Sequence, residues 1–162
     1  MTVNDTTPRE APPRIDPRGP RFGAAITVVF LAAALILGPG LGLIPLVIQA
    51  VAFGLGAILG LQYQPWGWIY RTAVRPRLGP PSEREDARPP RFAQLVGLIF
   101  AVVGIAGSLL GLSWLYYVAV AFALIAAILN SVFDFCLGCE IYLRFKRLSN
   151  RPVVPLRTPE RV

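Results

Sequence analysis

The sequence contains no histidine among its 162 residues. Histidine is the commonest general base and metal ligand near neutral pH, so its absence excludes Ser-His and Cys-His catalysis within this chain. Charged residues are also few, at 15% of the chain, whereas 54% of the residues are hydrophobic. With a mean hydropathy of +0.56, the chain is too apolar for an ordinary soluble domain of this size. The sequence therefore predicts a small integral membrane protein.

Four long stretches of the chain carry no acidic or basic residue. They cover residues 22–37, 43–61, 92–112 and 114–133. Each contains about 16 to 21 residues, near the roughly 20 that an α-helix needs to cross a bilayer. We therefore predict an all-α integral membrane fold with four transmembrane helices. The lack of charge within them argues against an ion-coupled transporter.

The connections between these helices differ sharply in charge. Residues 38–42 and 111–114 are short and uncharged, so each joins two helices into a tight hairpin. All 16 basic residues lie instead in the N-terminal segment, in the 62–91 connection and after the last apolar run. By the positive-inside rule, both termini and the central connection are expected to be cytoplasmic. The basic residues thus flank membrane helices, and no nucleic-acid-binding pattern accompanies them.

Both predicted hairpins begin with the same pattern, D-x-R-x-P-R-F. The two copies occupy residues 16–22 and 86–92, an offset of 70 residues. This repetition indicates a tandem duplication, with parallel halves packed about a pseudo-two-fold axis along the membrane normal. The segments that follow each hairpin also correspond, because residues 62–71 carry tryptophans where residues 134–142 carry cysteines.

Two interpretations of the repeated pattern stay open. In the first it is an interfacial anchor, in which Pro starts the helix, Arg contacts lipid phosphates and Phe enters the bilayer. In the second, arginines from both copies and the positive ends of two helices bind an anion, such as a sulfur oxyanion or a lipid headgroup. The anion site would consist of Arg18, Arg21, Arg88 and Arg91.

The segments outside the apolar runs are rich in Pro and charge, which favours tails and linkers. Amphipathic stretches at 65–74 and 138–148 predict short interfacial helices after the second and fourth helices. We predict a disordered cytoplasmic tail over 1–21, followed by a first hairpin with its interfacial helix over 22–75. A Pro-rich cytoplasmic linker covers 76–91. The second hairpin, with the cysteines and its interfacial helix, covers 92–148, and a flexible cytoplasmic tail covers 149–162.

The two cysteines of the chain are Cys136 and Cys139, and Glu140 follows directly. On a helix this spacing places both sulfurs and the carboxylate on one face, and at a helix start the local amide groups would lower a thiol pKa. Reversible dithiol, disulfide or persulfide chemistry is the leading interpretation, because C-x-x-C permits intramolecular closure. Glu140 would then tune a thiol or take a proton.

Other roles for the cysteines also stay open. They are buried structural residues in one interpretation and sites of S-palmitoylation in another. The sequence predicts no cofactor, and metal binding by Cys136 and Cys139 is the alternative. Zn or Fe would need the cysteines of two chains, whereas Cu(I) could be bound by one pair. A cytoplasmic location argues against a stable structural disulfide, because the cytosol keeps thiols reduced.

Several motifs occur together: the arm D-P-R-G-P-R-F, the segment G-L-Q-Y-Q-P-W-G-W-I-Y and the ending N-S-V-F-D-F-C-L-G-C-E-I-Y. As a set, over roughly residues 14–146, they resemble the bacterial membrane family called domain of unknown function 4395, which is well represented in actinobacteria. The resemblance implies a four-helix protein of the bacterial inner membrane with a terminal C-x-G-C-E-x-Y motif. It also implies association with thioredoxin-like and sulfurtransferase proteins, without assigning a reaction.

The leading hypothesis for function is a membrane-bound thiol or sulfur carrier. Cys136 or Cys139 would accept a disulfide or sulfane sulfur from a cytoplasmic thioredoxin-like or sulfurtransferase partner, and the arginines would guide an anionic donor. The alternative is a non-enzymatic scaffold, or a small-solute channel subunit that works as a homo-oligomer, with structural cysteines.

Overall fold

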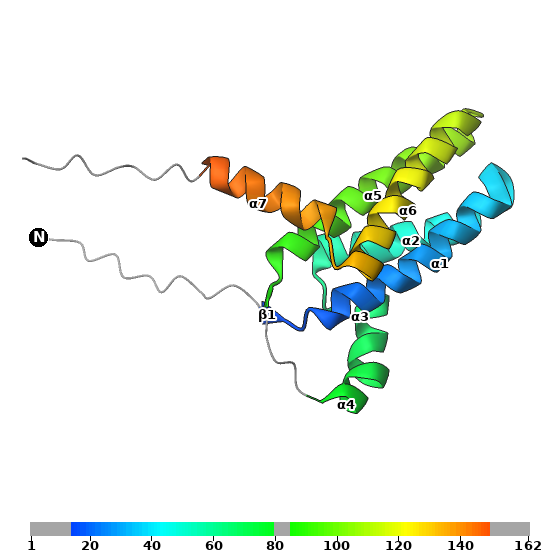
Figure 1. Ribbon diagram of the computed structural model, residues 1–162. Helices are drawn as coiled ribbons and strands as arrows, with labels where there is room; N and C mark the ends of the chain where they lie inside the picture. Colours follow the sequence, from blue (N-terminus) through cyan, green and yellow to red (C-terminus); the bar gives the residue numbers. More distant parts are fainter. Residues whose placement is uncertain (1–13, 80–84, 150–162) are drawn as a thin grey trace, which may run out of the picture.

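The computed structural model describes residues 14–79 and 85–149. Within these ranges the chain is mostly helical, and four long helices lie side by side while the shorter elements gather at one end (Figure 1). The predicted tails over 1–13 and 150–162 lie outside the described residues. The helical architecture follows from the long apolar runs, which satisfy their backbone hydrogen bonds internally.

The elements follow one another in an order that repeats a long hairpin and a shorter helical segment. They are β1 (Arg14–Ile15), α1 (Arg18–Leu41), α2 (Leu43–Gly54), the π-helical η1 (Leu55–Leu59), α3 (Pro65–Ile69), the π-helical η2 (Tyr70–Val74), α4 (Arg75–Leu78), β2 (Glu85–Asp86), α5 (Arg88–Leu109), α6 (Ser113–Phe133) and α7 (Leu137–Ser149). The strands β1 and β2 pair antiparallel, with Arg14 opposite Asp86. Helices are thus present at both positions predicted for short interfacial helices.

Three helices are long and apolar enough to cross a membrane, namely α1, α5 and α6. Their most apolar windows have mean hydropathies of 2.3, 2.1 and 2.1. The fourth apolar helix, Leu43–Leu59, combines α2 with η1 and is shorter. At 1.5 Å per residue it extends about 25 Å, compared with about 30 Å of hydrocarbon. These helices indicate a membrane protein.

The packing places small side chains between the helices and large apolar ones outside. The buried residues include Ala34, Ala50, Ala101, Ala119 and Ala123. In contrast, Ile36 is 84% exposed and Leu109 is 74% exposed. Water-soluble proteins do not expose so much large apolar surface, whereas membrane helices use small residues to bring their backbones together.

Helices α1 and α5 both begin one turn earlier than the apolar runs predict, at Arg18 and Arg88. Asp16 Oδ1 accepts the Arg18 backbone N–H at 3.0 Å, and Asp86 Oδ1 accepts that of Arg88 at 2.9 Å. The aspartates thus satisfy amide groups that a helix start leaves unpaired, and Pro is tolerated in a first turn. Residues 14–21, predicted as part of a disordered tail, therefore form β1 and the first turn of α1.

The predicted Pro-rich linker over 76–91 also contains regular structure. Its start lies in the short helix α4, and its end contains β2 and the first turn of α5. Residues 80–84 lie outside the described ranges. The polar sequence suggested a linker throughout, but the pairing of β2 with β1 orders the residues just before α5.

A kink ends the long straight part of α1. Gly38 has a φ of 73°, which breaks the helix directly before Pro39. The Tyr116 hydroxyl from α6 donates to the Ala34 carbonyl oxygen at 2.8 Å, and Tyr116 is fully buried. An unpaired carbonyl is costly in a membrane, so this bond from a neighbouring helix makes the kink tolerable.

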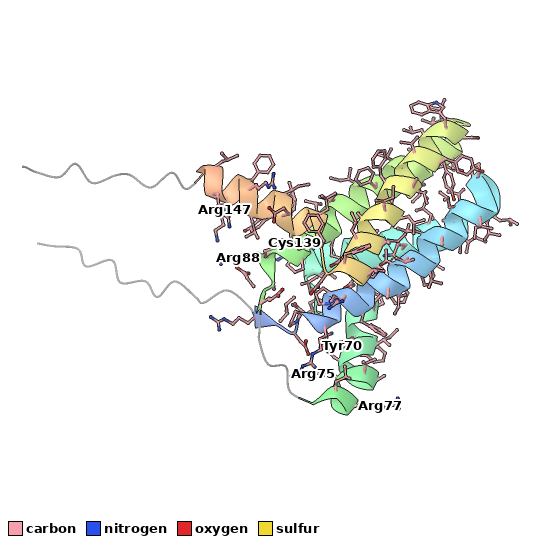
Figure 2. The ribbon with its side chains drawn as sticks, viewed as in Figure 1. Tyr70, Arg75, Arg77, Arg88, Cys139 and Arg147 are labelled. Atoms are coloured by element: carbon pink, nitrogen blue, oxygen red, sulfur yellow. A yellow bond between two sulfur atoms is a disulfide. The ribbon has the colours of Figure 1, made fainter. Side chains whose placement is uncertain are left out.

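Each hairpin packs against the other through both of its helices. Helix α1 contacts α2 and α6, and α5 contacts α6 and α2. Leu31, Leu46, Tyr116 and Val120 form the centre of the shared core. The short elements α3, α4 and α7 lie at one end of the bundle together with the strands (Figure 1). The labelled basic side chains and Cys139 are found at this same end, away from the hairpin tips (Figure 2).

Candidate functional site

The site begins where α6 ends. Asp134 follows the last residue of α6 and adopts a left-handed conformation, with φ of 56°. Asp is one of the few residues other than Gly that enters this region readily. The Phe135 N–H then donates to the Leu129 carbonyl oxygen at 3.1 Å, which closes the end of the helix. This turn redirects the chain so that Cys136 lies at the start of α7.

Cys136 acts as the N-cap of α7. Its carbonyl oxygen accepts the Glu140 N–H at 3.0 Å, and its Sγ accepts the Cys139 N–H at 3.3 Å. A side-chain acceptor for the third helical N–H is the usual N-cap arrangement, here with sulfur in place of oxygen. The backbone N–H and the positive end of α7 would therefore stabilise negative charge on Cys136 Sγ.

The Cys136 and Cys139 sulfurs form a disulfide, and their Cα atoms are 5.2 Å apart. This separation lies in the normal range for disulfides because the helix start places positions i and i+3 on one face. The predicted cytoplasmic location argued against a stable disulfide, whereas the structure has the pair in its oxidised form. Glu140 pairs with Arg144 at 3.0 Å, one turn further along α7.

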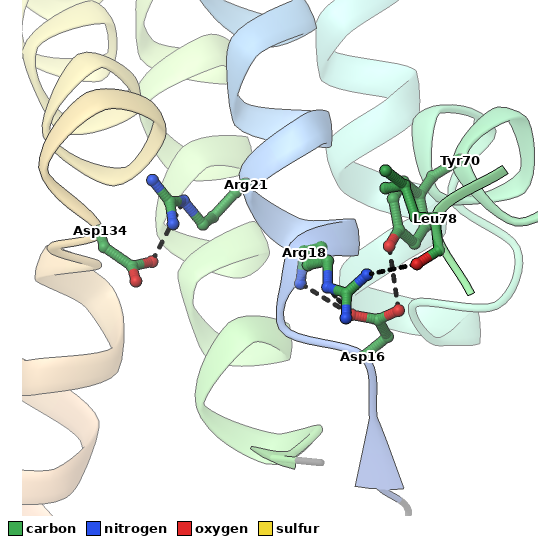
Figure 3. A network of polar contacts seen from close by, with 6 residues as sticks. All are labelled: Asp16, Arg18, Arg21, Tyr70, Leu78 and Asp134. Atoms are coloured by element: carbon green, nitrogen blue, oxygen red, sulfur yellow. Dashed lines mark hydrogen bonds and ion pairs between the residues drawn. The ribbon is translucent and has the colours of Figure 1, made fainter. Parts of the chain in front are cut away.

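The cysteines line a pocket of about 370 Å³ between the ends of α1, α5, α6 and α7. Arg21 and Asp134 lie at its polar end with the cysteines and Glu140, and their ion pair measures 3.3 Å (Figure 3). The remainder of the pocket is largely apolar and reaches Phe53, Phe100 and Phe122. Cys136 and Cys139 are each half-buried, and both line this pocket.

The four arginines predicted to form an anion site contact different partners. Arg18 lies 3.9 Å from Asp16 and donates to the Leu78 carbonyl oxygen at 3.5 Å (Figure 3). Arg91 donates to the carbonyl oxygens of Ala57 and Ile58 at 2.7 and 2.6 Å, at the end of η1. Arg88 bonds Asp86 through its backbone. Among the described residues, Arg21 is the one arginine that lines the cysteine pocket.

The segments that follow the two hairpins have matching aromatic contacts. Phe22 lies against Tyr70 with ring centres 5.8 Å apart, and Phe92 lies against Tyr142 at the same 5.8 Å. The planes of the rings meet at 45° and 44°. Trp66 precedes Tyr70 by one helical turn, and Gly138 precedes Tyr142 by the same turn. Trp66 and Gly138 therefore occupy equivalent places against α1 and α5.

Trp66 and Gly138 pack differently against their neighbouring helices. The indole stacks on Phe30 at 5.1 Å, and its N–H donates to Gln49 Oε1 at 3.2 Å. Gln49, fully buried, donates in turn to Thr27 Oγ1 at 2.9 Å. Gly138 instead lies so close to α5 that an added Cβ would meet the Ala93 Cα at 2.7 Å. Glycine at this position therefore lets α7 approach α5 closely, beside the pocket that Gly138 and Ala93 both line.

A second group of arginines surrounds Tyr70, which sequence reasoning missed. Arg14, Arg71 and Arg75 line a pocket of about 390 Å³ with Asp16. The Tyr70 hydroxyl donates to Asp16 Oδ2 at 2.9 Å (Figure 3), and burial, then this bond, raises the pKa of Tyr70. The signal in the sequence is the recurrence of Tyr after each hairpin, at Tyr70 and Tyr142.

Within residues 14–79 and 85–149, no group of three or more His, Cys, Asp or Glu side chains is arranged to hold a metal ion. The two-cysteine metal site stays a prediction. No curated protein matches the chain, and no solved structure matches it. A family model described as "Domain of unknown function (DUF4395)" matches residues 15–147, so the chain belongs to this family.

Proposed function

We propose that the protein is a membrane-bound thiol carrier that uses Cys136 and Cys139. The observation that carries this proposal is the pairing at the start of α7, where Cys136 Sγ accepts a backbone N–H and lies within bonding reach of Cys139. A stabilised thiolate beside a second thiol is the arrangement that thiol–disulfide exchange requires. The half-buried position at the mouth of a pocket keeps both sulfurs accessible.

The exchange runs in two steps. The Cys136 thiolate attacks one sulfur of a partner disulfide, which forms a mixed disulfide and releases the other partner sulfur as a thiolate. Cys139 then attacks Cys136 Sγ, forms the intramolecular disulfide and releases the partner as a dithiol. The partner gains two electrons and two protons, and the Cys136–Cys139 pair loses them. With a sulfane-sulfur donor, the first step would leave a persulfide on Cys136.

The membrane topology that we propose has four spans and both termini in the cytoplasm. Leu43–Leu59 would form the fourth span, because a helix slightly shorter than the hydrocarbon core is accommodated by local thinning. The matching Phe–Tyr contacts and aspartate caps of the two halves support a tandem duplication. The partner would then be a cytoplasmic thioredoxin-like or sulfurtransferase protein, and the membrane a bacterial inner membrane.

Thiol trapping in cells tests the proposal. A Cys139→Ser variant retains the attacking thiol but lacks the resolving one, so it should accumulate a mixed disulfide with its partner. Cys136→Ser is the matched control and should capture far less, by about tenfold or more, since Cys139 has no comparable cap. Equal absence of capture, with both thiols alkylating no faster than an unperturbed cysteine, would reject the carrier. Structural cysteines in a scaffold or channel subunit would give that result.

A further inference from the structure

The cysteine pocket extends from the polar end of the bundle into its apolar interior. Arg21 and Asp134 lie at one end with the cysteines, and Phe53 and Phe100 lie further along. Phe122 also lines the pocket while being 58% exposed, so the pocket borders the outer, apolar surface of the bundle. In a bilayer this side of the pocket would face the hydrocarbon, so a ligand that dissolves in hydrocarbon suits it.

Four charged residues line the pocket, and three of them are acidic: Arg21, Glu85, Asp134 and Glu140. Arg21 pairs with Asp134 at 3.3 Å, and Glu140 pairs with Arg144 at 3.0 Å. An anionic ligand would have to displace a carboxylate to reach the guanidinium, so the pocket suits a neutral polar group better. Asn130 also lines the pocket, and its amide can donate a hydrogen bond to a carbonyl oxygen.

We propose that this pocket binds a membrane quinone, and that the quinone oxidises the Cys136–Cys139 dithiol. The inference rests on the proposed thiol carrier with its exchange running in reverse: a partner dithiol reduces the Cys136–Cys139 disulfide and leaves as a disulfide, and the quinone then takes two electrons and two protons from the Cys136–Cys139 dithiol. A quinone is neutral, has a flat ring for aromatic surroundings, presents carbonyl oxygens and diffuses within hydrocarbon. The pocket volume of about 370 Å³ lies within the range of small-molecule sites, roughly 300 to 1,000 Å³.

The redox step balances without a further reactant. The Cys136 thiolate adds to a ring carbon of the quinone, and Cys139 then attacks Cys136 Sγ and breaks the new carbon–sulfur bond. One S–S bond forms while two S–H bonds are lost. The two electrons and two protons leave with the ring as a hydroquinone. Cys136 at the N-cap is again the attacking sulfur, as in exchange with the partner.

The first half of the chain explains why one such site is expected. Trp66 stacks on Phe30 and bonds Gln49 in the place equivalent to the pocket. Its ring occupies the volume that a quinone ring would need, and the segment around it contains no cysteine. The replacement of Trp by Gly and the presence of the cysteines therefore coincide in the second half.

The test uses the purified, reduced full chain in detergent without oxygen. The probe is a naphthoquinone with a short isoprenoid tail, followed by its absorbance change and by the loss of alkylatable thiols. Ala126→Phe fills the pocket, and Ala25→Phe adds the same ring at an exposed position of α1 outside it. We expect wild type and Ala25→Phe to form one hydroquinone per disulfide, at least tenfold faster than Ala126→Phe.

Equal quinone reduction by all three proteins would overturn the inference, as would oxidation no faster than that of a C-x-x-C peptide. If Cys139→Ser still captures its partner in cells, this failure leaves the thiol carrier standing. If the thiols also fail to capture a partner, both proposals fail. Asn130→Leu provides a second variant should Ala126→Phe not fold, and it should slow quinone reduction while leaving alkylation unchanged.

Discussion

Arg21 and Asp134 form an ion pair of 3.3 Å that joins the start of α1 to the residue after α6. Arg91 makes the equivalent connection from the start of α5 to the end of η1, but it bonds two backbone carbonyl oxygens, of Ala57 and Ile58. The second arginine of each copy of the pattern thus connects its own helix to the end of a helix in the other hairpin. The chemical difference between the two connections gives the first prediction.

Arg91→Gln should destabilise the bundle more than Arg21→Gln. Arg91 is also exposed, but its guanidinium donates to two helix-end carbonyl oxygens, so losing both hydrogen bonds should cost about 1 to 2 kcal/mol. The Arg21–Asp134 pair is substantially exposed, at 43% and 64%, and should contribute less than about 1 kcal/mol. Thermal unfolding in detergent, followed by circular dichroism, measures both. A larger loss for Arg21→Gln would contradict this ranking.

Gly138→Ala should disturb the packing of α7 on α5. The new Cβ would meet the Ala93 Cα and Cβ at 2.7 Å, and backbone there cannot move aside easily. We expect a destabilisation of about 1 to 3 kcal/mol and slower closure of the disulfide. Gly40→Ala is the matched control, because nothing lies within 4 Å of its added Cβ. Chemical unfolding and the rate of disulfide closure report the two effects, and equal behaviour of the variants would refute the contact.

Tyr70→Phe should remove an alkaline transition. Burial and the bond to Asp16 raise the pKa of Tyr70 above its ordinary value of 10.0. The stabilisation from the protonated hydroxyl is therefore complete below pH about 10, and it is lost as the pH rises through the folded-state pKa. The variant keeps the contact with Phe22 but loses the hydrogen bond, at about 1 to 3 kcal/mol near neutral pH.

Stability measured from pH 7 to 12 checks this prediction. The difference between wild type and Tyr70→Phe should shrink as the pH rises above about 10. A constant difference over the whole range would mean that ionisation of Tyr70 is not linked to folding. Thr72→Val serves as a control, because its hydroxyl bonds only carbonyls of its own helical segment, at Trp68 and Ile69, in the contacts of the described residues.

The proposed topology of four spans would place the hairpin tips and the cysteines on opposite sides of the membrane. In a background with both cysteines replaced by Ser, Gly40→Cys should react with a membrane-impermeant maleimide added to intact cells. Leu148→Cys, in α7, should react only after the membrane is opened. A three-span chain, in which Leu43–Leu59 stays on one side, would place both positions on the same side of the membrane. Both cysteines would then react in intact cells, or neither would.

The helical hairpins were predictable because four uncharged runs and two glycine-containing tips are local features. The starts of α1 and α5 were not, since hydropathy marks where Phe22 and Phe92 enter the bilayer and ignores the capping aspartates. Hydropathy also gives no sign of the π-helical turns η1 and η2. The carbonyl oxygen of Ala57 in η1 accepts a bond from Arg91, which is far away in the sequence, so this contact is not a local feature.

The cysteines were found from their spacing, but their surroundings could not be. Arg21 and Asp134 are far apart in the sequence, so only the packing of α1 on α6 shows that they share a pocket with Cys136. The anion-site prediction grouped four arginines by their place in a repeated pattern. Equivalent residues of two similar halves lie in similar surroundings, but they need not lie close to one another, as the different partners of Arg21 and Arg91 show.

The contrast between Trp66 and Gly138 bears on why the hairpins share one chain. Two identical hairpins that associate as a dimer would both carry tryptophan at this position or would both carry glycine. A single chain allows one half to carry an indole at this position while the other half carries glycine and the cysteines. Two similar hairpins in one chain can therefore have different side chains at equivalent positions, and one half can have a site that the other lacks.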